Sequence, residues 1–273
     1  MKLKEVFFGL GLKPPAREYG FDIQRFELKK DGVIEYAAWR HPKEKPKQFY
    51  QAQVDAIREF LSAGDFAIDI GAHTGDSTLP IALAVGAMGG VLALEPNPYV
   101  YKVLLANAGL NKRKANILPL MFAATADDAE MEFEYSDSGF CNGGLHKDIG
   151  AWTHAHFFKL LVQGRNLLRY LEREYPEILG RIRYVKIDTE GYDPDVARSI
   201  RSLLERNRPY IKTEIYKHLP GARRVQYLRE LQALGYRLHK WESEENYRGE
   251  VISERDADKW RHYDVFAVPP AGG

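Results

Sequence analysis

The spacing of apolar residues changes along this chain. Residues 23–28 and 33–38 form two short runs typical of strands, and Lys30-Asp31-Gly32 between them predicts a hairpin turn. Apolar positions in 49–61 recur at a helical period, and the segment stops at Gly64, as helices commonly do. We therefore expect an N-terminal hairpin followed by a helix.

From Asp65 onward, short apolar runs alternate with helical segments. This alternation predicts an α/β fold, with a mostly parallel sheet of seven strands and helices on both faces. The last two expected strands have no clear helix between them, which indicates a terminal hairpin and one antiparallel edge strand. We expect strands at 66–70, 91–95, 117–123, 184–188, 210–216, 236–241 and 263–268, and helices at 78–85, 99–110, 196–206 and 225–234.

The alternation is interrupted between residues 127 and 175 by a loop rich in Gly, Ser and Asn and a segment rich in His and aromatic residues. A connection of this length is typical of a lid or a binding loop. We expect residues 1–47 to form an N-terminal arm and hairpin extension. Residues 48–273 would form the main domain, with an inserted acceptor or lid segment at about 127–175.

Composition narrows the possible partners. The 39 basic and 38 acidic residues give a formal net charge of +1, so overall charge does not attract the chain to nucleic acid or to anionic membranes. A single cysteine, Cys141, excludes a disulfide within the chain and favours the cytoplasm. No apolar stretch approaches the ~18 residues that a transmembrane segment needs. A homo-oligomer is possible on the sequence alone.

The strongest local signal is residues 69–77, between the first strand of the main domain and its helix. Gly71 and Gly75 allow a sharp turn and close approach of a ligand. Glu95 ends the next strand, 20 residues beyond Gly75, where a carboxylate can accept hydrogen bonds from both ribose hydroxyls. His73 replaces the middle glycine of the dinucleotide fingerprint, which disfavours a pyrophosphate. Asn97 is expected to cap the following helix.

These residues, together with Leu94-Glu95-Pro96-Asn97-Pro98 and Val185-Lys186-Ile187-Asp188-Thr189-Glu190-Gly191, resemble the FkbM family of methyltransferases over roughly residues 48 to 268. The resemblance implies a Rossmann-like class I methyltransferase fold. It also implies S-adenosylmethionine as donor and O-methylation of a sugar, a glycan or a related natural product. The donor-binding candidates are Asp69, Gly71, Ala72, His73, Thr74, Gly75, Ser77, Glu95, Pro96, Asn97 and Ala123.

Four titratable residues are expected at the acceptor end of the sheet. Asp188 ends the fourth strand, Glu190 follows it, Glu214 lies in the fifth strand and His218 comes just after. In one interpretation Asp188 or His218 is a general base, with Glu190 beside the chemistry. In another, Asp188, Glu190 and Glu214 bind Mg²⁺ or another divalent cation, which prefers oxygen ligands. Structural roles, as loop caps or surface residues, remain open for all four.

The inserted segment holds Cys141 and three histidines, His146, His154 and His156, whose spacing matches no usual zinc pattern. Its aromatic residues are interpreted as a lid or sugar-stacking surface, or alternatively as core. Three other functions stay open: an NAD-dependent oxidoreductase, a methyltransferase acting on nucleic acid or protein, and a non-catalytic module that only binds the donor. The aromatic residues concerned are Phe140, Trp152, Phe157 and Phe158.

Overall fold

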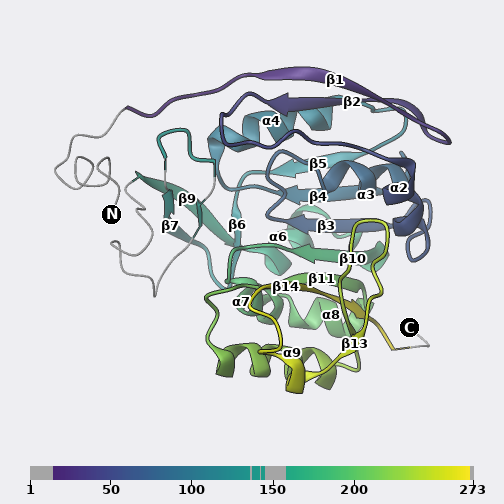
Figure 1. Cartoon of the computed structure of the whole chain (residues 1–273), viewed down its shortest axis with the longest axis vertical. Coiled ribbons are helices and arrows are strands. Elements are labelled where there is room, and N and C mark those ends of the chain that lie inside the picture. Colours follow the sequence, from purple (N-terminus) through teal and green to yellow (C-terminus); the bar gives the residue numbers. More distant parts are fainter. Residues whose placement is uncertain (1–14, 136, 142, 145–157, 271–273) are drawn as a thin grey trace.

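The computed structural model describes residues 15–135, 137–141, 143–144 and 158–270, and a sheet of eight strands lies at its centre (Figure 1). The chain runs from the central strand β3 to β4 and β5 on one side, and later returns to β10 on the other. Ligands bind beside such a reversal point in open α/β sheets. In spatial order the strands are β13 (Val251–Ile252), β12 (Arg237–Lys240), β14 (Tyr263–Val268), β11 (Tyr210–Ile215), β10 (Ile182–Ile187), β3 (Phe66–Ile70), β4 (Gly90–Leu94) and β5 (Ile117–Leu120).

The antiparallel strand is not where the sequence pattern placed it. Strand β14 runs antiparallel between β11 and β12, inside the sheet, and the short β13 forms the edge as an eighth strand. The reason is hydrophobic burial: Val265, Phe266 and Ala267 are all 0% exposed, so consecutive residues on both faces of β14 need cover. An edge position would leave part of that surface in water. The α/β fold and the predominance of parallel pairing are confirmed.

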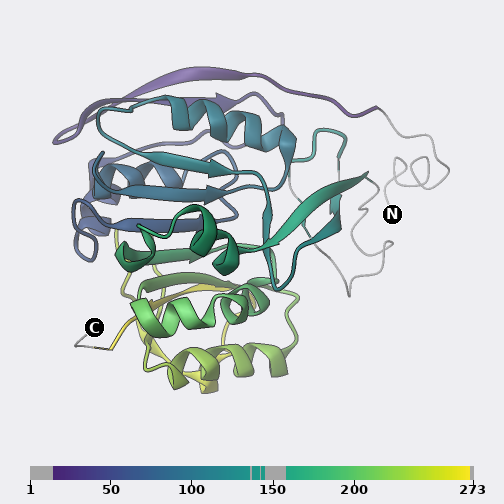
Figure 2. The same ribbon diagram turned by 180° about the vertical axis from the view of Figure 1, so that it is seen from behind.

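Helices cover both faces of the sheet, and Figures 1 and 2 show the two layers from opposite sides. Successive side chains of β3 point to opposite faces of the sheet and pack in two separate cores. Ile68 packs with the layer of α6, α7, α8 and α9, and Ala67 packs with α2 and α3. The helices are α2 (Gln51–Arg58), α3 (Thr78–Val85), α4 (Pro98–Gly109), α6 (Leu167–Glu174), α7 (Asp193–Ser199), α8 (Arg201–Asn207) and α9 (Gly221–Ala233), with 3₁₀ turns at Leu179–Arg181 and Glu254–Asp256.

Two smaller sheets flank the main one. The predicted N-terminal hairpin is present as β1 (Phe21–Leu28) and β2 (Gly32–Trp39), and β2 lies against α4. The interruption of the main pattern contains a sheet in the order β6-β9-β7-β8, which extends beyond the main sheet in Figure 1. Its strands are β6 (Ala123–Thr125), β7 (Ala129–Tyr135), β8 (Gly143–Gly144) and β9 (Phe158–Asn166).

Two expected elements are split in the structure. The strand expected at 117–123 ends at Leu120, because the chain then leaves the main sheet and Ala123 pairs with Gly164 of β9. The helix expected at 196–206 is divided into α7 and α8 at Ile200, whose φ and ψ of −108° and 15° depart from helical values. None of the helices within the described ranges is long and apolar enough to cross a membrane.

Candidate active site

A cavity of about 500 Å³ opens at the carboxyl ends of β3, β4 and β10. The inserted sheet closes one side of it, since Met131, Phe133 and Tyr135 of β7 line the wall. Residues of the loop between β2 and α2, among them Glu44 and Lys47, line another side. The cavity thus lies where the reversal of strand order predicts a ligand site, with walls from both flanking segments.

The loop after β3 turns sharply at Gly71. Gly71 has φ +79°, and a Cβ atom there would lie 1.9 Å from the carbonyl oxygen of Asp188, so a side chain cannot be accommodated. The amides of Gly71 and Ala72 both donate to the Leu94 carbonyl, at 3.0 and 2.9 Å. These contacts tie the ends of β3, β4 and β10 together at the cavity.

Glu95 is held in place by backbone donors. The His73 amide donates to Oε2 at 3.1 Å and the Asn97 amide donates to Oε1 at 2.8 Å. Glu95 is 7% exposed and lines the cavity. Burial raises the pKa of this carboxyl, and the nearby His73 and the two amides offset only part of that rise. Each oxygen has a second lone-pair direction free of these amides.

Some predicted donor-site residues line the cavity and others lie behind its wall. Asp69 is fully buried: Oδ2 accepts from the Ser77 and Thr78 hydroxyls at 2.8 and 2.7 Å, and Oδ1 accepts from Lys186 Nζ at 3.0 Å. Its role is to hold the loop. Asn97 caps α4 as predicted, accepting from the Tyr99 amide. The cavity-lining members of the predicted set are Gly71, His73, Ser77, Glu95, Pro96 and Ala123, whereas Asp69, Ala72, Thr74, Gly75 and Asn97 are not among the lining residues.

Asp188 faces the cavity beside a buried lysine. Its side chain is 44% exposed, and Oδ2 lies 3.3 Å from Nζ of Lys186. Burial would raise the pKa of Asp188, but the ammonium groups of Lys186 and Lys212 outweigh it and hold the pKa below its ordinary value. Asp188 is therefore ionised at neutral pH. Lys186 itself was missed as a site residue, although a lysine inside the apolar run of β10 signals a buried partner.

The other three titratable residues are divided by the structure. Glu190 lines the cavity, whereas Glu214 and His218 are not among its lining residues. Glu214 is 7% exposed; Oε1 lies 3.4 Å from Nε2 of His262, and Oε2 has no hydrogen-bond partner among the residues described. Burial, with the charges of Asp193 and other carboxylates, raises the pKa of Glu214 to about 9.

The predicted divalent-cation ligands do not form a close group. In the part of the chain that the structure describes, the metal-ligating side chains that come together are Glu44, His73 and Cys141, not Asp188, Glu190 and Glu214. Glu214 lies outside the cavity that Asp188 and Glu190 line.

Two of the four aromatic residues predicted to form a lid or stacking surface, Phe140 and Phe158, lie in the described part of the chain, and both are core. Phe140 is 5% exposed, stacks on Tyr99 at 4.6 Å and meets Tyr135 edge-on at 5.3 Å. Phe158 is 7% exposed and contacts Phe140. Neither presents a free ring for sugar stacking. Trp152, Phe157 and the histidines at 146, 154 and 156 lie outside the described residues.

Comparison with known proteins identifies the family to which the chain belongs. Residues 69–238 match the family model described as "Methyltransferase FkbM domain". None of the curated proteins matches the chain. Among solved structures, the methyltransferase FkbM of Methylobacillus flagellatus has 13% identity and a TM-score of 0.46, covering 76% of this chain but only 44% of its own. An S-adenosylmethionine-dependent O-methyltransferase of Thermotoga maritima has 16% identity and a TM-score of 0.41, covering 93% of this chain and 80% of its own.

Proposed function

Because the chain belongs to the FkbM family of methyltransferases, we propose that it transfers a methyl group from S-adenosylmethionine to a hydroxyl group of a sugar, a glycan or a related natural product. The observation that carries the proposal is Glu95. Two backbone amides orient this buried carboxylate toward the cavity, at the end of β4 where a ribose is bound in α/β sheets. Asp188 provides an ionised group at the end of β10 on the same cavity.

The donor half of the proposal assigns a role to each lining segment. Glu95 accepts hydrogen bonds from the two ribose hydroxyls, and Ala123 with Pro96 borders the adenine. The loop at Gly71 and His73 carries the methionine end. A phosphate is not needed anywhere in this arrangement, which favours this donor over NAD for a loop with a histidine in the middle glycine position.

The acceptor half rests on Asp188. Its carboxylate accepts a hydrogen bond from the acceptor hydroxyl and takes the proton as the oxygen attacks the methyl carbon. The bond between carbon and sulfur breaks, giving a methyl ether and S-adenosylhomocysteine. A carboxylate of low pKa is a weak base, so alignment of oxygen, methyl and sulfur contributes most of the rate. Glu190 lies at the same rim and binds a neighbouring acceptor hydroxyl.

A divalent cation bound at this rim is the alternative to proton transfer to Asp188. Mg²⁺ bound by Asp188 and Glu190, both of which line the cavity, would polarise the acceptor hydroxyl in place of proton transfer to Asp188. Full turnover in EDTA would assign the step to the protein side chains alone, and loss of turnover that Mg²⁺ restores would assign it to the cation.

The experiment that tests the function compares ligands first and acceptors second. S-adenosylhomocysteine should raise the melting temperature and NAD should not, because only the former fits a site without a pyrophosphate cradle. Methyl-labelled donor is then incubated with sugars and polyketide-type alcohols, with nucleic acid and protein as competing acceptor classes. Label in a base-stable ether of a hydroxyl compound supports the proposal. A melting shift with NAD alone contradicts the donor, and label in nucleic acid or protein contradicts the acceptor class.

A further inference from the structure

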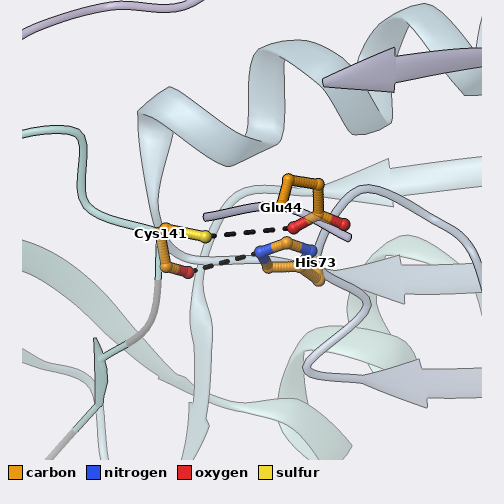
Figure 3. Close-up of side chains that lie close together, drawn as sticks. All are labelled: Glu44, His73 and Cys141. Carbon is orange, nitrogen blue, oxygen red and sulfur yellow. Dashed lines mark hydrogen bonds between the residues drawn. The ribbon is translucent and has the colours of Figure 1, made fainter. Parts of the chain in front are cut away.

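Three side chains from distant parts of the sequence meet at one wall of the cavity (Figure 3). Glu44 comes from the loop before α2, His73 from the loop after β3, and Cys141 from the segment after β7. Each offers one ligand atom, and these atoms all lie within 4.8 Å of one another. The Sγ atom of Cys141 is 3.9 Å from Oε2 of Glu44, and Nε2 of His73 is 3.3 Å from the carbonyl oxygen of Cys141.

We propose that Glu44, His73 and Cys141 form a binding site for a divalent transition-metal ion of the zinc class. Thiolate, imidazole and carboxylate are the side chains that bind Zn²⁺, and a thiolate disfavours Mg²⁺ and Ca²⁺. With bonds of about 2.0–2.3 Å, ligand atoms around a tetrahedral ion lie roughly 3.3–3.8 Å apart. The group therefore needs to contract by only about 1 Å to bind an ion. On coordination the Cys141 thiol releases its proton to solvent and His73 binds as neutral imidazole.

The surroundings of the three ligands favour an ion. Cys141 is 4% exposed, so a thiolate there needs a positive partner close to the sulfur. Glu44 holds its Oε1 atom 2.9 Å from Lys47, which leaves Oε2 to face the sulfur. The His73 ring meets Trp39 edge-on at 5.9 Å. The contact of Lys47 with the Glu44 carboxylate is of the kind that orients metal ligands from outside the coordination sphere.

A bound ion would connect three parts of the fold. It would join the N-terminal extension and the inserted segment to the loop after β3, all at the cavity wall. With three protein ligands, the fourth position is left for water, as in zinc sites that remain open. A ligand that binds only the folded chain also stabilises it, so the ion should raise the melting temperature.

The test is titration of the full, EDTA-treated chain with Co²⁺, followed by displacement with Zn²⁺. We expect one ion per chain and a charge-transfer band between thiolate and cobalt in the near ultraviolet. Cys141→Ser should abolish the band, and His73→Asn or Glu44→Gln should each weaken binding at least tenfold. His239→Asn is the matched control, because that ring bonds to the Gly249 carbonyl and does not line the cavity. Its affinity should equal that of the unaltered chain.

Melting curves without metal check that each variant folds. If Cys141→Ser fails to fold, the Glu44→Gln and His73→Asn affinities decide alone. A cobalt spectrum without sulfur ligation overturns the proposal, and so does an affinity that is unchanged in both of those variants. The titration uses no methyl donor, so its failure would leave the proposed methyl transfer untouched, and failure of donor binding would leave the metal site untouched.

Discussion

Asp188 and Glu214 lie at the carboxyl ends of the neighbouring strands β10 and β11, yet their surroundings drive these two carboxyl groups to opposite charge states. The pKa of Asp188 is lowered below its ordinary value, whereas the pKa of Glu214 is raised to about 9. Burial opposes ionisation at both positions. The difference is that Asp188 has ammonium groups close by, from Lys186 and Lys212, and Glu214 has mainly other carboxylates.

Exposure and charged partners both separate the two groups, because the Asp188 side chain is 44% exposed beside ammonium groups, whereas Glu214 is 7% exposed and faces other carboxylates. Lys186 is 5% exposed and lies 3.0 Å from the buried Asp69 and 3.3 Å from Asp188. One lysine thus holds the loop after β3 and also keeps the cavity-facing carboxylate ionised. Glu214 stays neutral at neutral pH and can donate a proton or a hydrogen bond, which Asp188 cannot. Pairs of carboxyls separated in this way commonly take different roles in a site.

Removing the shared partner should give the largest effect. Lys186→Met leaves Asp69 buried without its cation, so we expect the free energy of unfolding to fall by about 3–5 kcal/mol. Urea unfolding measures this loss. The matched control is Lys30→Met, because the Lys30–Asp55 pair is exposed and its loss should cost about 1 kcal/mol or less. Equal losses in the two variants would contradict the central position of Lys186.

Changing the ionised carboxyl should lower turnover much more than it lowers donor affinity. Asp188→Asn is expected to reduce turnover by about 100-fold or more, because the proton acceptor is lost. Affinity for S-adenosylhomocysteine should change by less than about threefold, since we propose that Asp188 binds the acceptor and not the donor. Steady-state kinetics and calorimetry separate the two. Asp127→Asn, at an exposed pair with Arg169, is the control. Matching losses in turnover and donor affinity would make Asp188 a donor-site residue.

Changing the neutral carboxyl should have its smallest effect at acidic pH and a distinct pH dependence. Between the unfolded pKa of about 4.3 and the folded pKa of about 9, the folded chain holds a proton at Glu214 that the unfolded chain has lost. The contribution of Glu214 to the free energy of unfolding is therefore complete below about pH 4.3 and is lost as pH rises toward 9. Glu214→Gln removes that loss, with a slope difference of up to about 1.4 kcal/mol per pH unit.

Urea unfolding at pH 5, 7 and 9 checks this difference, and the Gln variant should become the more stable chain as pH rises. Asp193 has a pKa raised to about 7 by burial and by Asp188, and it is present in both chains, so its own contribution largely cancels. If the free energies of unfolding of the two chains change in parallel with pH, Glu214 is already ionised at neutral pH. The two carboxyl groups would then not differ in charge.

The positions of Gly71 and Glu95 at the cavity could be predicted because their signals are local in sequence. A turn that tolerates only glycine at Gly71 and a carboxylate at the end of the next strand, Glu95, follow directly from strand endings. The internal place of β14 could not be predicted, since it depends on which strands the last segment meets in space. The same holds for the charge of Glu214, which distant elements determine.

The group of Glu44, His73 and Cys141 shows most clearly what cannot be predicted from the sequence. Glu44 and Cys141 are 97 positions apart, and spacing rules for metal sites work only when ligands are neighbours in sequence. Cys141 with the nearby histidines matched no zinc pattern, yet the fold gives it two other partners. Lys186 is the opposite case, because a lysine within a buried strand is visible in the sequence.

The most direct test of methyl transfer at this cavity is isothermal titration of the unaltered chain and of Glu95→Ala with S-adenosylhomocysteine. We expect one site per chain with micromolar affinity, weakened by about 1–3 kcal/mol in the variant, because the carboxylate proposed to bind two ribose hydroxyls is lost. No binding to the unaltered chain, or equal affinity in both chains, would contradict the assignment of Glu95 and of the cavity as the donor site.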